Sequence, residues 1–246
     1  MLKKLLKNLI NRNILLIFVL FSIIANPVST GADDYGFRFV RIKFNTGSDG
    51  FRGRQYTPPW KHDYPTAELN LYEALERTTK IKVHGLPLIL SLNDEKIFEY
   101  PFLYLCEPGF WNASEEEAKN LREYLTRGGF ILFDDFRGSY EWYNFYDQIK
   151  KAFPEKEMVE IPNDHPIWKV YYEVDPLEVP SLVSGRYGRN DDQYYTMYDD
   201  KGRMMMVVCF NQDIGDGWEW PDNNYDNAST SAFQMGINII IYALTH

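Results

Sequence analysis

Two adjacent carboxylates are the first candidates for chemistry in this sequence. The stretch 128–138 has two glycines, then an apolar run, then Asp134 and Asp135. In an open parallel α/β sheet, ligands bind just outside the carboxyl ends of the strands. Because successive strand residues point to opposite sides, we expect the two aspartates to have different roles. They either cap a helix, as structural groups, or supply a carboxylate for metal binding or acid/base work.

Other polar residues near predicted strand and helix ends extend this set. The candidate catalytic residues are Asp134, Asp135, Glu68 and His165. Glu68 lies in the first turn of a predicted helix, where stabilising the helix dipole is the alternative to catalysis. An oxygen-rich site with one histidine suits a divalent cation, but no spacing here specifies metal ligands. No cofactor is identified from the sequence.

Aromatic and charged residues in predicted loops are the candidates for ligand binding. They are Trp60, His62, Asp63, Arg52, Arg54, Asp213 and Trp218. The two arginines lie in a glycine-containing loop that matches neither the dinucleotide fingerprint nor the phosphate-binding loop motif. The high aromatic content, with 18 Tyr and 16 Phe, fits either a well-packed core or a platform for a flat ligand such as a sugar.

A nucleophile of the elbow type is disfavoured. The strained turn that presents such a nucleophile needs small residues two positions away on each side. Cys106 has Tyr104 and Pro108 there, bulky residues flank both aspartates, and no GxSxG motif occurs. The sequence therefore argues against an esterase or a cysteine amidotransferase mechanism and leaves open whether the protein is an enzyme.

Alternating strands and helices must position these residues. Apolar patterns predict strands over 37–44 and 102–106, a buried strand that starts after Gly129 and ends at the two aspartates, helices over 65–78, 114–125 and 229–244, and a hairpin over 193–210. A helix after 135, a hairpin insertion at 86–92 and a polar loop at 213–227 complete the prediction. This order predicts a three-layer α/β domain whose sheet is mainly parallel, with an antiparallel hairpin near the C-terminus.

The first 32 residues predict an export signal. Four basic residues accompany an apolar run from Ile14 to Ala25, which is shorter than the ~20 residues of a membrane span. An uncleaved membrane anchor is the alternative, and residues 33–246 form a single domain in either case. Without the segment, 22 basic and 35 acidic residues leave a net charge of −13, which disfavours nucleic-acid binding. Cys106 and Cys209 either form one disulfide or remain buried free thiols.

Several motifs together resemble a known family. They occur in the segments Trp60–Asn70, Tyr100–Tyr104, Leu121–Gly129, Asp134–Asp135, Asp164–Pro166 and Met235–Asn238. This series resembles the bacterial domain of unknown function 4159 family over roughly 37–244. The resemblance implies a flavodoxin-like fold similar to class I glutamine amidotransferases and ThuA-like proteins, with the aspartate pair near the position of the missing amidotransferase cysteine. It also implies envelope partners of the MoxR-type ATPase and von Willebrand A domain systems.

Three functions remain open. The leading hypothesis is an exported module that binds a small molecule, a carbohydrate or a partner beside Asp135. The second is a carboxylate- or metal-dependent hydrolase acting on carbohydrate, and the third is a structural docking module of a cell-envelope complex. The site hypothesis requires Asp135, Glu68 and His165 to converge within about 8 Å in the folded protein.

Overall fold

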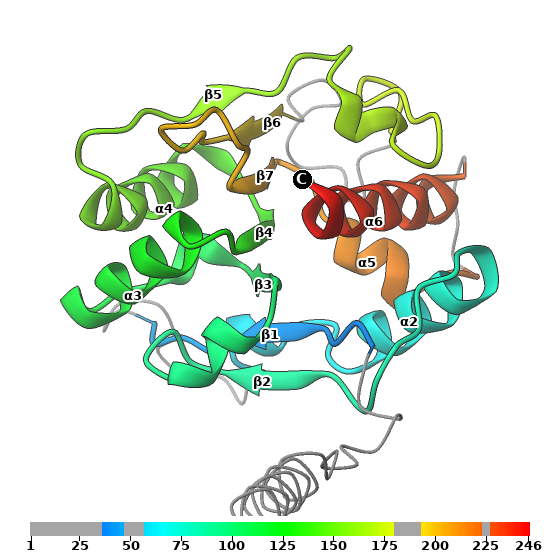
Figure 1. Ribbon diagram of the computed structural model, residues 1–246, viewed down its shortest axis with the longest axis horizontal. Helices are drawn as coiled ribbons and strands as arrows, with labels where there is room; N and C mark the ends of the chain where they lie inside the picture. Colours follow the sequence, from blue (N-terminus) through cyan, green and yellow to red (C-terminus); the bar gives the residue numbers. More distant parts are fainter. Residues whose placement is uncertain (1–35, 47–56, 180–192, 223–226) are drawn as a thin grey trace, which may run out of the picture. The chain divides into compact units, whose positions relative to one another are not determined.

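A seven-stranded sheet organises the computed structural model, which describes residues 36–46, 57–179, 193–222 and 227–246 (Figure 1). The strands follow the order β2-β1-β3-β4-β7-β6-β5. Their bounds are β1 Val40–Ile42, β2 Leu88–Leu90, β3 Phe102–Cys106, β4 Phe130–Phe136, β5 Val159–Glu160, β6 Gln193–Thr196 and β7 Met206–Phe210. The first five strands in this order are parallel, and β6 runs antiparallel to both of its neighbours. The predicted mainly parallel sheet with a late antiparallel hairpin is confirmed.

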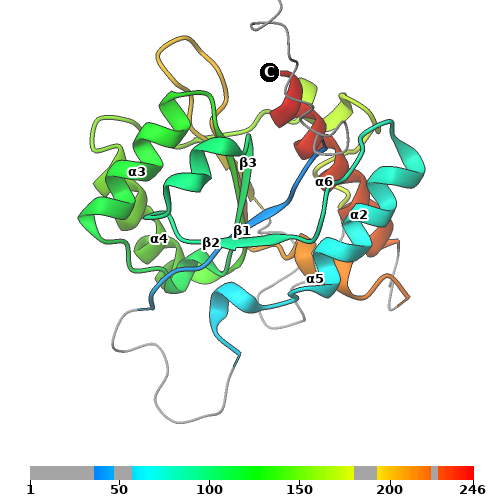
Figure 2. The same ribbon diagram turned by 60° about the horizontal axis from the view of Figure 1, so that its bottom comes forward.

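Helices cover both faces of the sheet (Figures 1 and 2). On one side lie α3, Glu115–Thr126, and α4, Gly138–Ala152. On the other lie α2, Thr66–Thr78, α5, Ile214–Glu219, and α6, Ala228–Thr245. Alternate residues of β4 serve the two layers, because Leu132 packs with the α2 and α6 side and Phe133 with the α3 and α4 side. The three-layer α/β architecture expected from the sequence is therefore present.

Local signals set the start of β4, the strand that carries the two aspartates. The Ser114 hydroxyl accepts from the Glu117 amide at 3.1 Å, and the Glu117 carboxylate accepts from the Ser114 amide at 2.9 Å. This capping box begins α3 where the sequence predicts it. Gly128 follows α3 with a φ of 111°, a conformation that glycine adopts without steric cost, and the chain then enters β4.

Two local predictions are wrong. The segment 213–227, expected to be a polar loop, contains α5, because Asp213 caps it by accepting from the Asp216 amide. The segment expected to be a hairpin insertion contributes β2, a parallel edge strand. In β1, Arg41 is fully buried and pairs with Glu68 of α2, whereas Lys43, which follows on the same side, is exposed.

The structure also bears on the predictions about the two cysteines and the N-terminal segment. Cys106 and Cys209 are both buried and no disulfide joins them, so the disulfide alternative is wrong. Within the described ranges, no helix combines the length and the apolar character needed to cross a membrane. The export segment, Arg52 and Arg54 lie outside the described residues. Short 3-10 turns, η1 Pro59–Lys61, η2 Glu95–Glu99, η3 Pro108–Phe110 and η4 Pro166–Lys169, complete the fold.

Candidate functional site

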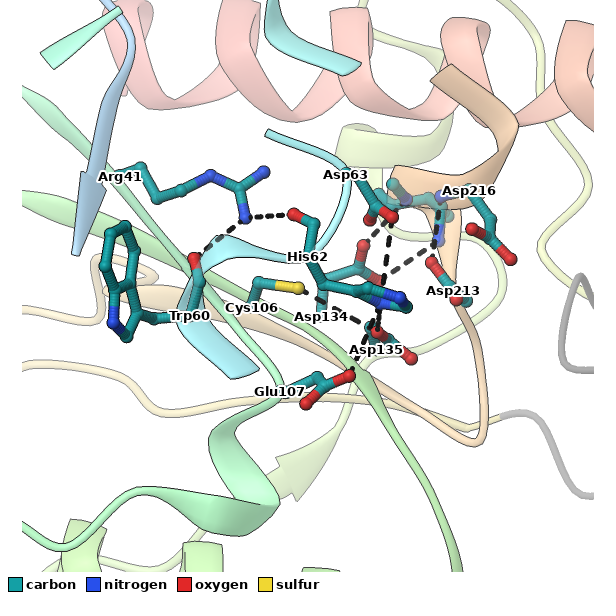
Figure 3. A network of polar contacts seen from close by, with 12 residues as sticks. Arg41, Trp60, His62, Asp63, Cys106, Glu107, Asp134, Asp135, Asp213 and Asp216 are labelled. Atoms are coloured by element: carbon teal, nitrogen blue, oxygen red, sulfur yellow. Dashed lines mark hydrogen bonds and ion pairs between the residues drawn. The ribbon is translucent and has the colours of Figure 1, made fainter. Parts of the chain in front are cut away.

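Acidic side chains gather at the carboxyl ends of the central parallel strands (Figure 3). His62 and Asp63 come from the segment between η1 and α2, which follows β1 in the chain. Cys106 and Glu107 end β3, Asp134 and Asp135 end β4, and Asp213 and Asp216 belong to the cap and first turn of α5, after β7. Strands β1, β3, β4 and β7 are neighbours in the sheet, so their ends meet at one edge.

Three of these acids have left-handed backbone conformations. The φ angles are 62° at Asp63, 50° at Glu107 and 58° at Asp135. At Asp135 the pairing of β4 with β7 also shifts register between Phe133 and Phe136. A positive φ is uncommon for residues other than glycine, costs about 1–3 kcal/mol and occurs preferentially at functional sites. The chain therefore holds three carboxylates in one place at an energetic cost.

His62 is the centre of the cluster. Its Nδ1 atom lies 3.0 Å from Asp135 Oδ2, 3.3 Å from Glu107 Oε1 and 3.7 Å from Asp63 Oδ1. The hydrogen bond to Asp135 raises the pKa of His62 to about 9, and the charges of Asp63 and Glu107 add to the shift. About half of the His62 side chain, 48%, is exposed, so the cluster opens to solvent on this side.

Asp135 is the buried anion of the cluster. It pairs with Arg137, accepts from His62, and lies 3.8 Å from the Cys106 sulfur through its Oδ2 atom. Burial works to raise the pKa of Asp135, but the hydrogen bond from His62 and the charge of Arg137 overcome it and leave the pKa below its ordinary value. Asp135 therefore remains ionised, with Oδ1 paired to Arg137 and Oδ2 facing His62 and Cys106.

Asp134 has a different, structural task. Its carboxylate accepts from the amides of Ile214 at 3.2 Å and Gly215 at 2.9 Å, and from the Tyr104 hydroxyl at 3.0 Å. Burial and the neighbouring Asp135 charge raise its pKa to about 7. Both oxygens of Asp134 are thus occupied in attaching α5 to the sheet. The expectation that the two aspartates act differently is met by this geometry.

Asp63 is buried without hydrogen bonds. Its side chain is 0% exposed, and neither carboxylate oxygen has a hydrogen-bond partner among the described residues. Burial raises the pKa of Asp63 to about 8, with further increases from the charges of Asp135 and Asp216. Glu107 resembles it, because burial and Asp135 raise its pKa to about 8. A buried carboxylate without hydrogen bonds is costly, and the charged group recorded beside Asp63 is His62 at 3.7 Å, so this arrangement favours a proton or a further cation.

A buried ion pair holds the segment that carries His62. Arg41 of β1 pairs with Glu68 of α2, and both side chains are fully buried. The same guanidinium donates to the carbonyls of Trp60 at 3.1 Å and His62 at 2.7 Å. Glu68 therefore positions the site through Arg41. The main contact of Glu68 is this ion pair with Arg41, rather than an interaction with the dipole of α2.

Acidic groups in the cluster outnumber the cations recorded beside them. Burial raises the pKa of Asp213 well above its ordinary value, and burial together with the Asp135 charge raises that of Asp216. Besides His62, the cations near these acids in the described residues are Arg137, whose Nη2 lies 3.9 Å from Asp213 Oδ2, and Arg41, which is paired with Glu68. This imbalance makes the cluster a strong candidate for cation binding.

Two sets of donor atoms have metal-ligand proximity. One atom from each of His62, Asp63, Cys106 and Asp135 lies within 4.8 Å of the others, and the same holds for Asp63, Asp213 and Asp216. In a tetrahedral site with ion–ligand distances of about 2.1 Å, ligand atoms are about 3.4 Å apart. The separations of 3.0 and 3.7 Å from His62 to Asp135 and Asp63 bracket that value. The residues present fit a divalent cation.

Several predicted residues lie away from this cluster. His165 accepts from the Ile167 amide, and its ring is 5.6 Å from that of Tyr242. Tyr242 in turn contacts Phe130 at the start of β4, the opposite end of the strand from Asp135. Asp135, Glu68 and His165 therefore do not form one group, so the site hypothesis that required these three residues to converge fails as stated, and the cluster around His62 has a different membership.

The two tryptophans predicted to bind a ligand, Trp60 and Trp218, lie in different surroundings. Trp218 is buried, donates through its indole to the Ala232 carbonyl at 2.9 Å and packs against Tyr104 in the core. Trp60 is half-buried, lies 5.7 Å from the Lys43 ammonium and contributes its carbonyl to Arg41. Core packing thus accounts for Trp218, and Trp60 lies beside the segment that carries His62.

Sequence reasoning missed some members of the site. Glu107 was part of a closing turn, Cys106 was considered as a nucleophile, a disulfide partner or a buried thiol, and Arg41 was assigned to the less fully buried side of a strand. Glu107 could have been found by the rule that located the aspartates, since it directly follows the buried strand β3. No local signal identifies Arg41, whose burial depends on Glu68 in another element.

The fold and the site define a three-layer α/β domain with a cluster of acidic side chains at the carboxyl edge of its sheet. The chain belongs to the family described as Domain of unknown function (DUF4159), whose model matches residues 38–244. No curated protein matches the chain. The family predicted from the motifs is confirmed, and the likeness to amidotransferase and ThuA-like folds stays a prediction.

Proposed function

We propose that the protein binds a divalent cation through His62, Asp63 and Asp135 and presents it to a ligand at the edge of the sheet. The observation that carries the proposal is the buried carboxylate of Asp63, which has no hydrogen bond among the described residues and whose Oδ1 lies 3.7 Å from His62 Nδ1. A cation there compensates the clustered negative charge that burial otherwise penalises.

The donor set indicates which ions bind. An imidazole nitrogen with two carboxylates suits Zn²⁺ or Mn²⁺ better than Mg²⁺ or Ca²⁺, which prefer oxygen donors alone. Cys106 lies close enough to join, but burial and the Asp135 charge raise the pKa of its thiol well above the ordinary value. Ligation by His62, whose pKa is raised to about 9, also has to displace a proton, but the Cys106 thiol holds its proton more firmly still, and Cys106 is assigned no ligand role.

The exposed side of His62 supports a role in ligand binding. Structural metal sites are closed, whereas sites that act on ligands keep a coordination position open. The 48% exposure of the His62 side chain leaves such an opening beside the buried aspartates. The ligand class that suits an open divalent ion is an oxygen-bearing small molecule, such as a carboxylate or a carbohydrate.

Metal titration of the protein tests this proposal. We expect Zn²⁺ and Mn²⁺ to bind and raise the melting temperature, as measured by calorimetry and elemental analysis. His62→Ala is expected to weaken affinity at least about 100-fold, since loss of second-shell partners alone costs about 10–100-fold. His165→Ala is the matched control and is expected to bind normally. Failure of the wild-type protein to bind either ion, or equal binding by His62→Ala, would overturn the proposal.

Hydrolysis is a second candidate, favoured by Glu107. This carboxylate lies 3.3 Å from His62 and is 17% exposed, so it stands between the buried acids and solvent. A bound divalent ion supplies Lewis-acid chemistry, and a neighbouring carboxylate suits proton transfer to or from water. Release of product from ester or glycoside panels by the metal-loaded protein, lost in Glu107→Gln with metal affinity retained, distinguishes hydrolysis from binding alone.

We also infer that the protein acts outside the cytoplasm with envelope partners. Support comes from the basic and apolar N-terminal sequence and from the motifs that resemble a family linked to MoxR-type ATPase and von Willebrand A domain systems. Fusion of residues 1–40 to a reporter that is active only after export tests the location. A reporter that stays inactive argues against export.

A further inference from the structure

A second group of donor atoms adjoins the proposed cation site. Oxygens of Asp63, Asp213 and Asp216 lie within 4.8 Å of one another, and Asp63 is common to this group and to the group that contains His62. Figure 3 shows Asp63 between the His62 ring and the first turn of α5. The shared residue raises the question of whether one carboxylate serves two ions.

The two oxygens of Asp63 face different neighbours. Oδ1 is the atom 3.7 Å from His62 Nδ1. Oδ2 lies 2.7 Å from the position that a Cβ atom would occupy at Gly215, on the α5 turn that also carries Asp216. Gly215 thus leaves space for this oxygen beside α5. A carboxylate with one oxygen toward each donor group has the arrangement of a bridging ligand.

Existing hydrogen bonds leave Asp63 as the available oxygen donor between the two groups. Asp134, the nearest alternative, uses its carboxylate to accept from two backbone amides of α5 and from Tyr104. Asp63 is fully buried, and neither of its oxygens accepts a hydrogen bond among the described residues. This unpartnered buried carboxylate is an observation independent of the acidic cluster, and it points into both donor groups.

The remaining donors of the second group are also suitably placed. Asp213 accepts from the Asp216 amide at 2.9 Å through Oδ1, so its other oxygen is directed elsewhere and lies 3.9 Å from Arg137. Asp216 is half-buried, so a cation held by it stays in contact with solvent. All donors in this group are carboxylate oxygens, a set that favours Mg²⁺, Ca²⁺ or Mn²⁺ over Zn²⁺.

We propose that the protein holds a second divalent cation between Asp63, Asp213 and Asp216, with Asp63 bridging it to the cation at His62. The inference rests on the proposed function, because the bridge requires the first ion. Ions in two-metal sites are about 3.5–4 Å apart, a separation that one bridging carboxylate spans. Mn²⁺ suits both donor sets, the one with imidazole and the one of oxygens alone, and is therefore the ion that fills both positions.

Mn²⁺ titration of the protein, followed by elemental analysis and electron paramagnetic resonance, tests the bridge. We expect two ions per chain in the wild-type protein, with a spectrum broadened by coupling between them. Asp216→Asn is expected to bind one ion and to give the uncoupled six-line spectrum. Glu219→Gln changes a carboxylate on the same helix outside the donor group and is expected to keep two coupled ions.

The outcomes separate the two proposals. One ion in the wild-type protein, lost in His62→Ala, overturns the second site and leaves the cation at His62 in place, whereas one ion retained in His62→Ala overturns the cation at His62. No bound ion overturns both. Two coupled ions in Asp216→Asn overturn the assignment of this residue. Circular dichroism of each variant verifies that the fold is retained, and His62→Ala, which removes the other position, is expected to leave at most one uncoupled ion.

Discussion

Replacing Asp63 by Asn is expected to stabilise the metal-free protein. The carboxylate is buried and lacks hydrogen bonds, so its ionised form opposes folding. Asn is nearly the same size and tolerates the left-handed backbone at this position, where φ is 62°. The substitution therefore removes the charge and leaves the backbone unstrained.

The magnitude follows from the pKa of Asp63, which burial raises to about 8 from about 3.9 in an unfolded chain. A raised carboxyl pKa means that the folded state binds the proton more tightly. The resulting destabilisation is absent below about pH 4, grows with pH and is complete above about pH 8. Four pKa units correspond to on the order of 5 kcal/mol. Relaxation around the charge reduces this value, and we expect a gain of about 1–3 kcal/mol at pH 9.

Thermal and urea denaturation in the presence of a chelator measure this gain. It corresponds to a rise in melting temperature of about 2–4 °C for each kcal/mol in a chain of this size. The gain should shrink at pH 5, and saturating Mn²⁺ should reverse the order, because the wild-type protein alone gains about 2.7 kcal/mol at 100 times the dissociation constant. Asp147→Asn, an exposed substitution on α4, should change stability by less than about 0.5 kcal/mol. A loss of stability in metal-free Asp63→Asn at pH 9 would refute the reasoning.

Two further predictions concern the surroundings of the site. Glu68→Gln leaves the buried Arg41 guanidinium without its counter-charge and is expected to cost about 3–5 kcal/mol in urea denaturation. The double variant Glu68→Gln with Arg41→Met should recover part of that loss, and strictly additive losses would contradict the ion-pair argument. Glu107, whose pKa burial raises to about 8, makes the folded state bind protons more tightly, so the metal-free protein should lose stability from pH 6 to pH 9. Glu107→Gln should reduce that loss, and an unchanged pH dependence would count against the assignment.

The sequence by itself determined the elements and part of the site. Continuous apolar runs at β3 and β4, and a capping box before α3, are local signals, because they depend on neighbours a few residues away. The position of Asp134 and Asp135 after a buried strand was enough to place them at the carboxyl edge. Side-chain alternation was enough to predict that they differ in role.

Tertiary structure decided which of the other acids join them. The pairing of β1 with β3, β3 with β4 and β4 with β7 brings four strand ends together, and periodicity carries no information about that order. Glu107 enters the cluster because β3 lies beside β4, and His165 is excluded because its neighbour Tyr242 contacts the other end of β4. The order of strands in the sheet, rather than the type of residue, therefore determines which side chains join the cluster.

Tertiary structure also determined which charged side chains are buried and which of them are paired. From the sequence, Arg41 belongs to the less fully buried side of a predicted strand. In the fold it is fully buried, because Glu68 of a separate helix supplies the counter-charge. Asp63 lies just before a predicted helix, yet the fold buries its carboxylate without a hydrogen bond from any described residue. The sequence determines which residues carry charge, whereas desolvation and pairing, which set their chemistry, arise only when distant segments meet.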